Sequence, residues 1–307
     1  MKLFAGSTNE PLARDIAKIG KIVLGRLEIH KFPDGETRIR ILDDVMDEKV
    51  WVLQSRGDNP DSAYMELFFI VDGLRRSGAK SVGCIIPYLP YQRQDHMFRS
   101  GEAVSMGVIV KTLESTGAEK IITFDLHTIK IPELFGISVI HLSALSLFAK
   151  TIKDKFKDSK DLVLVSPDMG GVRRIKILSD ELSAPYAVIE KDRDLATGEI
   201  KSLDFKGEIK KNAIIVDDMI STGRTIVAAS DLLFKKGADK VYVFATHPIF
   251  SDDTASNFRG SRISEIYVTD SIYCSEGKRF EKLKILSLAE MISKEILKND
   301  TSTSSVS

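Results

Sequence analysis

The chain has 307 residues, 43% of them hydrophobic, which is enough for two domains with cores of their own. Because its 44 Lys and Arg residues balance 44 Asp and Glu residues, no overall electric field attracts nucleic acid or an anionic membrane. Two cysteines are too few for a disulfide framework and no stretch approaches the ~18 apolar residues of a membrane span, so we expect a cytoplasmic protein.

Hydrophobic runs and amphipathic segments alternate along the first half of the chain and predict strands and helices in turn. Residues 36–41 alternate polar and apolar side chains, so we expect a half-solvated antiparallel hairpin there. The predicted strands cover residues 2–5, 23–29, 37–41, 50–54, 82–87 and 120–124. The predicted helices cover residues 9–19, 62–77 and 102–115.

The second half of the chain repeats this alternation of strands and helices. Its predicted strands cover residues 162–166, 186–190, 213–216, 240–246 and 263–269. Its predicted helices cover residues 144–156, a stretch after residue 168, residues 226–236 and residues 287–297.

A leucine, three further residues and Gly-Ala occur shortly before an apolar run at three places, which begin at Leu74, Leu113 and Leu233. Glycine suits the left-handed position after a helix, and the apolar runs suit strands that are covered on both faces. The sequence therefore predicts an α/β fold of two similar halves, each a mainly parallel sheet flanked by helices. We expect domains at residues 1–145 and 146–297 and a disordered tail at residues 298–307.

The most informative segment, residues 214–225, joins an apolar run to two carboxylates and a turn of small hydroxyl residues. Ligands of parallel sheets bind beyond the carboxyl ends of the strands, and N–H groups at the start of a helix suit phosphate. Asp217 and Asp218 would repel phosphate, so we expect them to face sugar hydroxyls or a hydrated cation. The pattern favours a sugar phosphate, although solvated acids before a capped helix remain the alternative. The groups that could hold the phosphate are Ser221, Thr222, Gly223 and Thr225.

Residues 88–96 bring aromatic, guanidinium, amide and carboxylate groups together in one loop after a predicted strand. Arg93 can pair with phosphate, Gln94 can both donate and accept hydrogen bonds, and an aromatic ring can lie against a base. This combination is typical of nucleotide binding, and a solvated loop is the alternative.

Two further strand ends carry polar residues that suit a metal or a phosphate. Asp125 and His127 point to one side of the chain, and His127 could contact a metal or its water, although Mg²⁺ prefers oxygen ligands. Asp168 precedes two glycines and two arginines, a set that suits a metal and phosphate site. Close helix packing would also explain the glycine pair.

Five motifs occur in a fixed order: FPDGE at residues 32–36, RQD at 93–95, DLH at 125–127, SPDMGG at 166–171 and VDDMISTGRT at 216–225. Together they closely resemble the ribose-phosphate diphosphokinase family, also called phosphoribosyl pyrophosphate synthetases, over nearly the whole chain. The resemblance implies two tandem type I phosphoribosyltransferase-like domains. It also implies transfer of the diphosphoryl group of ATP to the anomeric hydroxyl of ribose 5-phosphate, giving phosphoribosyl pyrophosphate and AMP for nucleotide biosynthesis.

The resemblance further implies a role for each matching residue. ATP would contact Asp34, Gly35 and Glu36, lent by a neighbouring subunit, together with Arg93 and Gln94. His127 and Asp168 would bind Mg²⁺, directly or through water. Ribose 5-phosphate would be held by Arg193, Asp217, Asp218, Ser221, Thr222, Gly223, Arg224 and Thr225. Residues 191–199 match a mobile basic loop, in which Lys191 and Arg193 would be catalytic, whereas the charge pattern alone predicts a solvated hairpin tip.

Residues 96–103 depart from the regulated members of the family, because they lack the strongly basic segment that follows RQD there. This version resembles archaeal-type members more closely and speaks against allosteric inhibition by ADP. We expect a homo-oligomer, either a dimer or a hexamer. Two other functions remain open: a phosphoribosyltransferase that consumes phosphoribosyl pyrophosphate, and a catalytically silent relative that serves as a regulatory subunit.

Overall fold

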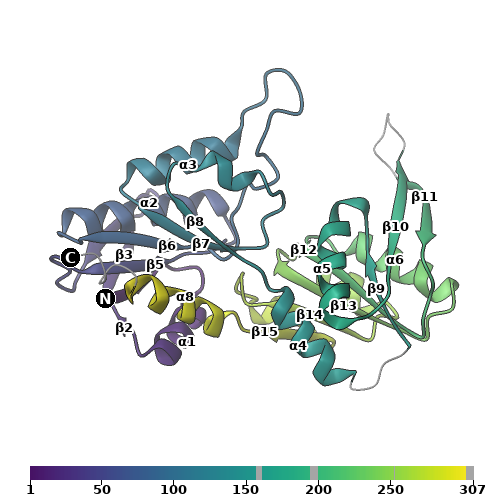
Figure 1. Cartoon of the computed structure of the whole chain (residues 1–307). Coiled ribbons are helices and arrows are strands. Elements are labelled where there is room, and N and C mark those ends of the chain that lie inside the picture. Colours follow the sequence, from purple (N-terminus) through teal and green to yellow (C-terminus); the bar gives the residue numbers. More distant parts are fainter. Residues whose placement is uncertain (157–160, 194–199, 252, 302–307) are drawn as a thin grey trace. The chain divides into compact units, whose positions relative to one another are not determined.

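The computed structural model describes residues 1–156, 161–193, 200–251 and 253–301, with side chains described except at residues 191–193, 200–203 and 301. The chain forms two units, each with a sheet of its own (Figure 1). Unit 1 comprises Met1–Leu142, Ser271–Tyr273 and Ser287–Ser307. Unit 2 comprises Ser143–Asp270 and Cys274–Leu286.

Unit 1 contains a six-stranded sheet in the order β2-β1-β5-β6-β7-β8, and every neighbouring pair is parallel. Its strands are β1 (Lys2–Ala5), β2 (Val23–Leu24), β5 (Lys49–Leu53), β6 (Ser81–Ile85), β7 (Lys120–Phe124) and β8 (Ser138–Leu142). In β5, β6 and β7 the last four residues are buried, as expected for strands covered on both faces. Asp125 and His127 therefore follow directly after the buried end of β7.

Helices cover both faces of this sheet. They are α1 (Glu10–Gly20), α2 (Pro60–Arg76), α3 (Ser105–Ser115) and α8 (Ala289–Thr301). In Figure 1, α2 and α3 lie above the strands and α1 and α8 lie below them. The Asn59 side chain caps α2 by accepting the N–H groups of Asp61 and Ser62, which fixes where this helix begins.

The predicted hairpin is confirmed as a separate antiparallel pair, β3 (Leu27–Lys31) and β4 (Thr37–Ile41), with alternating exposure along β4. The predicted single strand at residues 23–29 is wrong, since it divides into β2 and β3 around Gly25. Gly25 packs directly against the Phe4 ring, where a Cβ atom would collide, and its N–H donates to the carbonyl of Leu3 at 2.8 Å. This close approach bends the chain between the two strands.

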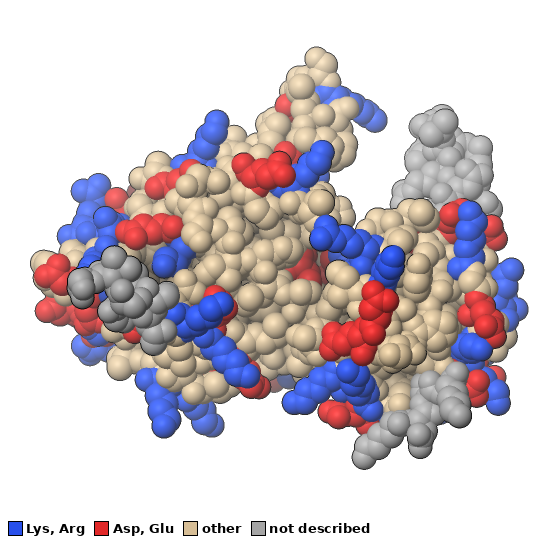
Figure 2. Space-filling view, in the orientation of Figure 1, with Lys and Arg blue, Asp and Glu red and all other residues tan. Residues whose placement is uncertain are grey.

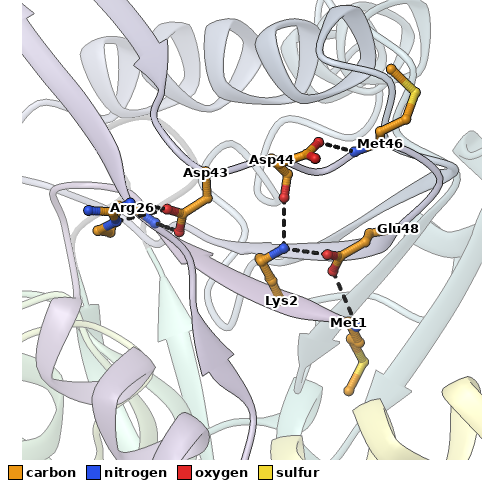
Figure 3. A network of polar contacts seen from close by, with 7 residues as sticks. All are labelled: Met1, Lys2, Arg26, Asp43, Asp44, Met46 and Glu48. Atoms are coloured by element: carbon orange, nitrogen blue, oxygen red, sulfur yellow. Dashed lines mark hydrogen bonds and ion pairs between the residues drawn. The ribbon is translucent and has the colours of Figure 1, made fainter.

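A polar network fixes the segment between β4 and β5 to β1 and to the chain before β3 (Figure 3). Lys2 Nζ donates to the Asp44 carbonyl at 2.7 Å and also pairs with Glu48. The Asp43 carboxylate accepts the Arg26 backbone N–H at 2.8 Å and its Nε–H at 2.7 Å. Lys2 and the N-terminal ammonium lower the pKa of Glu48 below its usual value, against the opposing effect of burial. The edge of the sheet is thus held by charge pairs on partly exposed side chains.

Unit 2 contains a seven-stranded sheet in the order β11-β10-β9-β12-β13-β14-β15, in which only the pairing of β10 with β11 is antiparallel among the described strands. Its strands are β9 (Leu162–Ser166), β10 (Tyr186–Arg193), β11 (Ile200–Lys206), β12 (Asn212–Ile220), β13 (Lys240–Pro248), β14 (Glu265–Thr269) and β15 (Leu283–Leu286). Its helices are α4 (Leu145–Lys155), α5 (Val172–Leu182), α6 (Arg224–Lys235) and α7 (Thr254–Arg259). The predicted α/β class with mainly parallel sheets is confirmed in both units.

Strand β12 is longer than the sequence predicts, because its pairing with β13 continues through Met219–His247 and Ile220–Pro248. The predicted strand ended at Val216, where the polar residues begin. Asp217 and Asp218 therefore lie within the strand rather than after it. Backbone pairing with a neighbour that ends at Pro248 overrides the local preference of two acids for a turn.

The helix predicted at residues 287–297 forms as α8 but belongs to unit 1, whereas we expected it within a domain of residues 146–297. Its residues Ile292 and Ile296 are completely buried, and Ser293 packs closely against Gly20 of α1. Residues 298–301, expected in a disordered tail, continue this helix, and the rest of that tail lies outside the described residues. The apolar spacing predicts a helix but does not encode which sheet it covers.

Lys and Arg side chains are interspersed with Asp and Glu on the face shown in Figure 2, in keeping with the zero net charge. A helix of the length and apolar content that a membrane span requires does not occur in the described part of the chain. Electrostatic attraction for an anionic ligand must therefore come from local groups.

Candidate functional site

Asp217 and Asp218 lie near the end of β12 in unit 2, where Arg174 of α5 faces both. The distance from Arg174 Nη1 to Asp217 Oδ1 and from Nη2 to Asp218 Oδ2 is 3.7 Å in each case. Burial, followed by the negative charges of Asp218 and Asp168, raises the pKa of Asp217 well above its usual value, and Arg174 opposes this shift. The strand end thus concentrates carboxylates that a ligand hydroxyl or a cation would stabilise.

The turn after β12 leads through Gly223 into the start of α6. Gly223 adopts φ +75°, and a Cβ atom there would lie 2.8 Å from the Phe258 ring, so the position requires glycine. Because glycine has no side chain, it cannot cap α6 in the usual way, and the N–H of Arg224 instead donates to Thr222 Oγ1 at 3.3 Å. Arg224, the first helical residue, is exposed and reaches Asp253 at 3.4 Å.

Residues of α7 hold the carbonyl groups of this turn. Thr254 Oγ1 donates to the Ser221 carbonyl at 2.6 Å, and Asn257 Nδ2 donates to the Thr222 carbonyl at 2.9 Å. The carbonyl oxygens of Ser221 and Thr222 are therefore both engaged by side chains of α7. These two bonds fix a shape that suits a phosphate group.

Asp168 follows β9 in extended conformation, with φ −163°. Its Oδ1 accepts the Gly171 N–H at 3.2 Å, and its carbonyl accepts the Ser166 hydroxyl at 2.7 Å. A Cβ atom at Gly171 would collide with Ser166 Oγ, so this glycine is required for close packing. The packing explanation of the glycine pair is therefore supported at Gly171, and the Asp168 carboxylate remains the candidate ligand.

In unit 1 the residues after β7 form a second polar strand end. Asp125 is buried with an uncommon φ of +32°, and the His127 side chain is exposed. The Leu126 N–H donates to His141 Nε2 at 3.0 Å. Burial lowers the pKa of His141, against the opposing charge of Asp125, so this ring is neutral and can accept a hydrogen bond.

The segment between β6 and α3 extends from unit 1 as a long loop (Figure 1). Arg93 and Gln94 are exposed there and border a hollow of 410 Å³ together with His96 and Phe98. Gln94 Oε1 accepts the Ser105 hydroxyl at 2.7 Å, which fixes the amide to the start of α3. A guanidinium, an amide and aromatic rings thus surround one hollow, as the sequence suggested for a nucleotide.

The FPDGE motif forms the exposed turn between β3 and β4. Gly35 adopts φ +94° and donates its N–H to the Phe32 carbonyl at 2.9 Å, and Asp34 Oδ1 accepts the Glu36 N–H at 3.1 Å. These bonds are internal to the hairpin. The motif is therefore presented on a preformed and accessible tip.

Models of two protein families match the chain: the N-terminal domain of ribose phosphate pyrophosphokinase at residues 1–117, and the phosphoribosyl synthetase-associated domain at residues 202–306. The chain is 37% identical over 289 residues to a ribose-phosphate pyrophosphokinase of Fusobacterium nucleatum, covering 94% of this chain and 91% of that protein. It is 36% identical over 297 residues to one of Bacillus caldolyticus, covering 96% and 93%. The chain belongs to the ribose-phosphate pyrophosphokinase family.

A solved structure extends this ribose-phosphate pyrophosphokinase relationship to the fold. The crystal structure of phosphoribosylpyrophosphate synthetase from Mycobacterium smegmatis matches with a TM-score of 0.91 and 33% identity, covering 97% of this chain and 99% of that one. These relatives are bacterial, so the expected closer likeness to archaeal-type members is not borne out. The missing basic segment after RQD is a feature of this chain and does not indicate its lineage.

The site residues expected for a ribose-phosphate pyrophosphokinase divide between the two units. Unit 1 carries the residues expected at ATP, which are Asp34, Gly35, Glu36, Arg93 and Gln94, and also His127. Unit 2 carries Asp168, Lys191 and Arg193, and the residues expected at ribose 5-phosphate, which are Asp217, Asp218, Ser221, Thr222, Gly223, Arg224 and Thr225. Lys191 and Arg193 lie on β10 opposite β11, while their side chains and residues 194–199 lie outside the described part of the structure.

Sequence reasoning missed the residues that support the two strand ends. Arg174 was noted only as part of a basic pair, and Thr254 and Asn257 were not noted at all. The sequence did contain a hint of the Arg174 contact, because a cation about one helical turn after the glycine pair faces back toward the strand end. For Thr254 and Asn257 the sequence gives no signal, since more than 30 residues separate them from the carbonyls they hold.

Proposed function

We propose that this protein transfers the diphosphoryl group of ATP to the anomeric hydroxyl of ribose 5-phosphate, giving phosphoribosyl pyrophosphate and AMP. The observation that carries the proposal is the glycine turn at the start of α6 beside Asp217 and Asp218 at the end of β12. It combines an anion site with hydrogen-bond acceptors for sugar hydroxyls, and family membership supplies the acceptor substrate.

For ribose 5-phosphate, the N–H groups at residues 223–225 would hold the phosphate, with Ser221, Thr222 and Thr225 adding hydroxyls. Asp217 and Asp218 would accept hydrogen bonds from the sugar hydroxyls. A hydroxyl donor near Asp217 would also relieve the repulsion that raises its pKa. Exposed Arg224 would contribute charge to the phosphate end.

For ATP, Arg93 would pair with the phosphates and Gln94 would hydrogen-bond the nucleotide, beside the hollow that they border. Asp34, Gly35 and Glu36 would approach the adenine of a neighbouring subunit, and their exposure on a hairpin tip supports this. The enzyme would accordingly act as a homo-oligomer, a dimer or a hexamer.

Mg²⁺ would be held by His127 and Asp168, directly or through water, and it would neutralise charge on the phosphate groups. The described side chains contain no cluster of three or more His, Cys, Asp and Glu residues that could hold a metal ion. The donor set nevertheless fits Mg²⁺, since this ion keeps several waters and binds through one or two carboxylates together with substrate phosphates. Carboxylates that repel one another around Asp217 provide a further reason for a cation.

In the reaction, the anomeric oxygen forms a bond to the β-phosphorus as the bond between the β-phosphorus and the bridging oxygen of AMP breaks. The hydroxyl proton passes to solvent, and AMP leaves with the bridging oxygen. Positioning and charge neutralisation dominate such transfers, so no protein nucleophile is required. Lys191 and Arg193, which lie on β10 opposite β11, would neutralise the negative charge of the transferring group.

The two cysteines are buried and form no disulfide, which suits a protein of the cytoplasm.

The decisive experiment supplies ATP, Mg²⁺ and ribose 5-phosphate and measures AMP and phosphoribosyl pyrophosphate together. Equal amounts of the two products are expected. A phosphoribosyltransferase would instead consume phosphoribosyl pyrophosphate and a base without ATP, and a silent regulatory relative would bind ligands without turnover. Either result would refute the proposal.

A further inference from the structure

A buried glutamine connects the two loops of unit 1 that carry the proposed nucleotide and metal residues. Gln92 Oε1 accepts the backbone N–H of His127 at 2.7 Å, and the Gln92 side chain is only 1% exposed. Its neighbours Arg93 and Gln94 are exposed. One residue of the RQD loop thus points inward to the DLH loop, while the next two point outward.

The backbone before Gln92 produces this inward turn. Tyr91 adopts φ +68°, an uncommon conformation for a large residue that requires support from its surroundings. Its hydroxyl bonds to Asp61, and the buried Tyr64 hydroxyl donates to the Pro90 carbonyl at 3.0 Å. Helix α2 therefore holds the loop in the conformation that buries the Gln92 side chain.

The oxygen is the atom of the Gln92 amide that a described protein group engages. Within the described part of the chain, Gln92 Nε2 is buried without a hydrogen-bond partner, which is unfavourable for a polar atom. An apolar side chain of similar length would fill the space without this penalty. The hydrogen bond from the His127 N–H engages the oxygen of the amide, which such an apolar side chain could not replace.

A second contact joins the same loops and shows that the connection is not an isolated one. Thr128 Oγ1 donates to Asp95 Oδ2 at 2.8 Å. Residues 92 and 95 on one loop are therefore bonded to residues 127 and 128 on the other. The two bonds fix the direction in which Arg93 and Gln94 project relative to His127.

We infer that Gln92 is a positioning residue that holds the nucleotide loop and His127 in register through its side-chain oxygen. This inference rests on the proposed function, because it assumes that Arg93, Gln94 and His127 contact ATP and its Mg²⁺. Gln92 itself is buried and acts through the backbone of His127. Loss of the contact should leave ribose 5-phosphate binding in unit 2 unchanged.

The test compares Gln92→Met, which keeps the length and removes the oxygen, with Gln92→Glu, which keeps an acceptor. Replacing Nε2 by oxygen removes no hydrogen bond among the described residues, and burial favours the neutral form of the new carboxyl, so Gln92→Glu keeps an acceptor at this position. In the full-length protein, amide exchange by NMR reports the His127 N–H, and calorimetry reports the Kd values of ATP and ribose 5-phosphate. Neither readout requires turnover.

We expect Gln92→Met to accelerate exchange at His127 by about 10-fold or more and to weaken ATP binding by about 10-fold, with ribose 5-phosphate binding changed by less than about 2-fold. Gln92→Glu should keep the His127 amide protected and restore most of the ATP affinity. Gln54→Met is the matched control, since Gln54 is a buried amide of the same unit that bonds to Thr8 and Glu66. It should lower the melting temperature without exposing the His127 amide.

A His127 amide that stays protected in Gln92→Met would overturn the inference, and so would unchanged ATP binding despite lost protection. Absence of AMP release by the unmodified protein would instead refute the proposed function. The measurements therefore distinguish a failure of this inference from a failure of the proposed function. A general loss of folding in Gln92→Met would appear in the melting curve, and Gln92→Glu would then decide the question.

Discussion

Arg174 Nη1 lies 3.7 Å from Asp217 Oδ1, which places a partly buried guanidinium against an acid whose pKa is raised by burial and by neighbouring carboxylates. The charges do not balance, because the single cation of Arg174 faces the carboxylates of both Asp217 and Asp218. Without a ligand, the folded protein therefore retains unfavourable charge at the end of β12.

Arg174→Met should destabilise the protein by about 3 kcal/mol at pH 8, because it leaves the buried acids uncompensated. Since the folded pKa of Asp217 lies above its unfolded value of 3.8, stability decreases as pH rises through the folded pKa. Removal of Arg174 raises that pKa further, so the deficit should be smaller at pH 5. Urea unfolding at the two pH values measures this, and Arg14→Met, which breaks an exposed pair with Glu10, is the control. An equal deficit at both pH values would contradict the prediction.

Asp217→Asn should separate stability from binding. The amide removes the repulsion with Asp218, so the free energy of unfolding at pH 8 should stay equal or increase. Ribose 5-phosphate binding should weaken by about 10-fold because an acceptor for a sugar hydroxyl is lost, while ATP binding stays unchanged. Calorimetry with each ligand checks this. Equal losses for both ligands would argue against the assignment of Asp217 to the sugar.

Lys191→Ala should lower kcat by roughly 10²-fold and leave the affinities for ATP and ribose 5-phosphate nearly intact, if this residue neutralises charge in the transition state. Lys206→Ala on the partner strand β11 is the matched control, since Lys206 is exposed and pairs with Glu190 at 2.8 Å. It should leave kcat unchanged. Near-normal turnover in Lys191→Ala, with an unchanged melting curve, would instead support a solvated hairpin tip.

Gly223→Ala should be more damaging than Gly237→Ala, although both glycines have positive φ, +75° and +109°. A Cβ atom at residue 223 meets the Phe258 ring at 2.8 Å, whereas nothing lies within 4 Å of one at residue 237. The conformational strain alone costs about 1 kcal/mol, and the clash at residue 223 should add to it and weaken ribose 5-phosphate binding. Thermal unfolding and calorimetry measure the two effects. Equal losses of stability in the two variants would show that Phe258 yields to the added methyl group.

The strands, helices and motifs of this chain could be predicted from sequence because local signals encode them. The apolar runs of β5, β6 and β7 and the alternation along β4 all formed as expected. The extension of β12 and the destination of α8 could not be predicted, since both depend on a partner far along the chain. The preference of a segment for helix or strand does not indicate which distant segment it will pack against.

The same division holds for the candidate site. Residues that would contact ligands occur in recognisable clusters at strand ends, as in residues 93–95 and 217–225. The residues that orient them, such as Arg174, Asn257 and Gln92, act across 35 to 43 positions of sequence, and a single chain gives no sign of these contacts. Gln92 in particular was included only as a member of a polar loop, although it is the one residue of residues 92–94 that is buried.

Helix α8 completes unit 1 with residues that follow unit 2 in the sequence, and this has a consequence for synthesis on the ribosome. Helix α8 packs against α1, which is made some 270 residues earlier, so the nascent unit 1 exposes an apolar face of α1 until α8 has been made. Unit 2 lies mostly within the interrupting segment and can close first. The first-made unit is therefore the last to mature, and a stalled or truncated chain would present its uncovered face to chaperones.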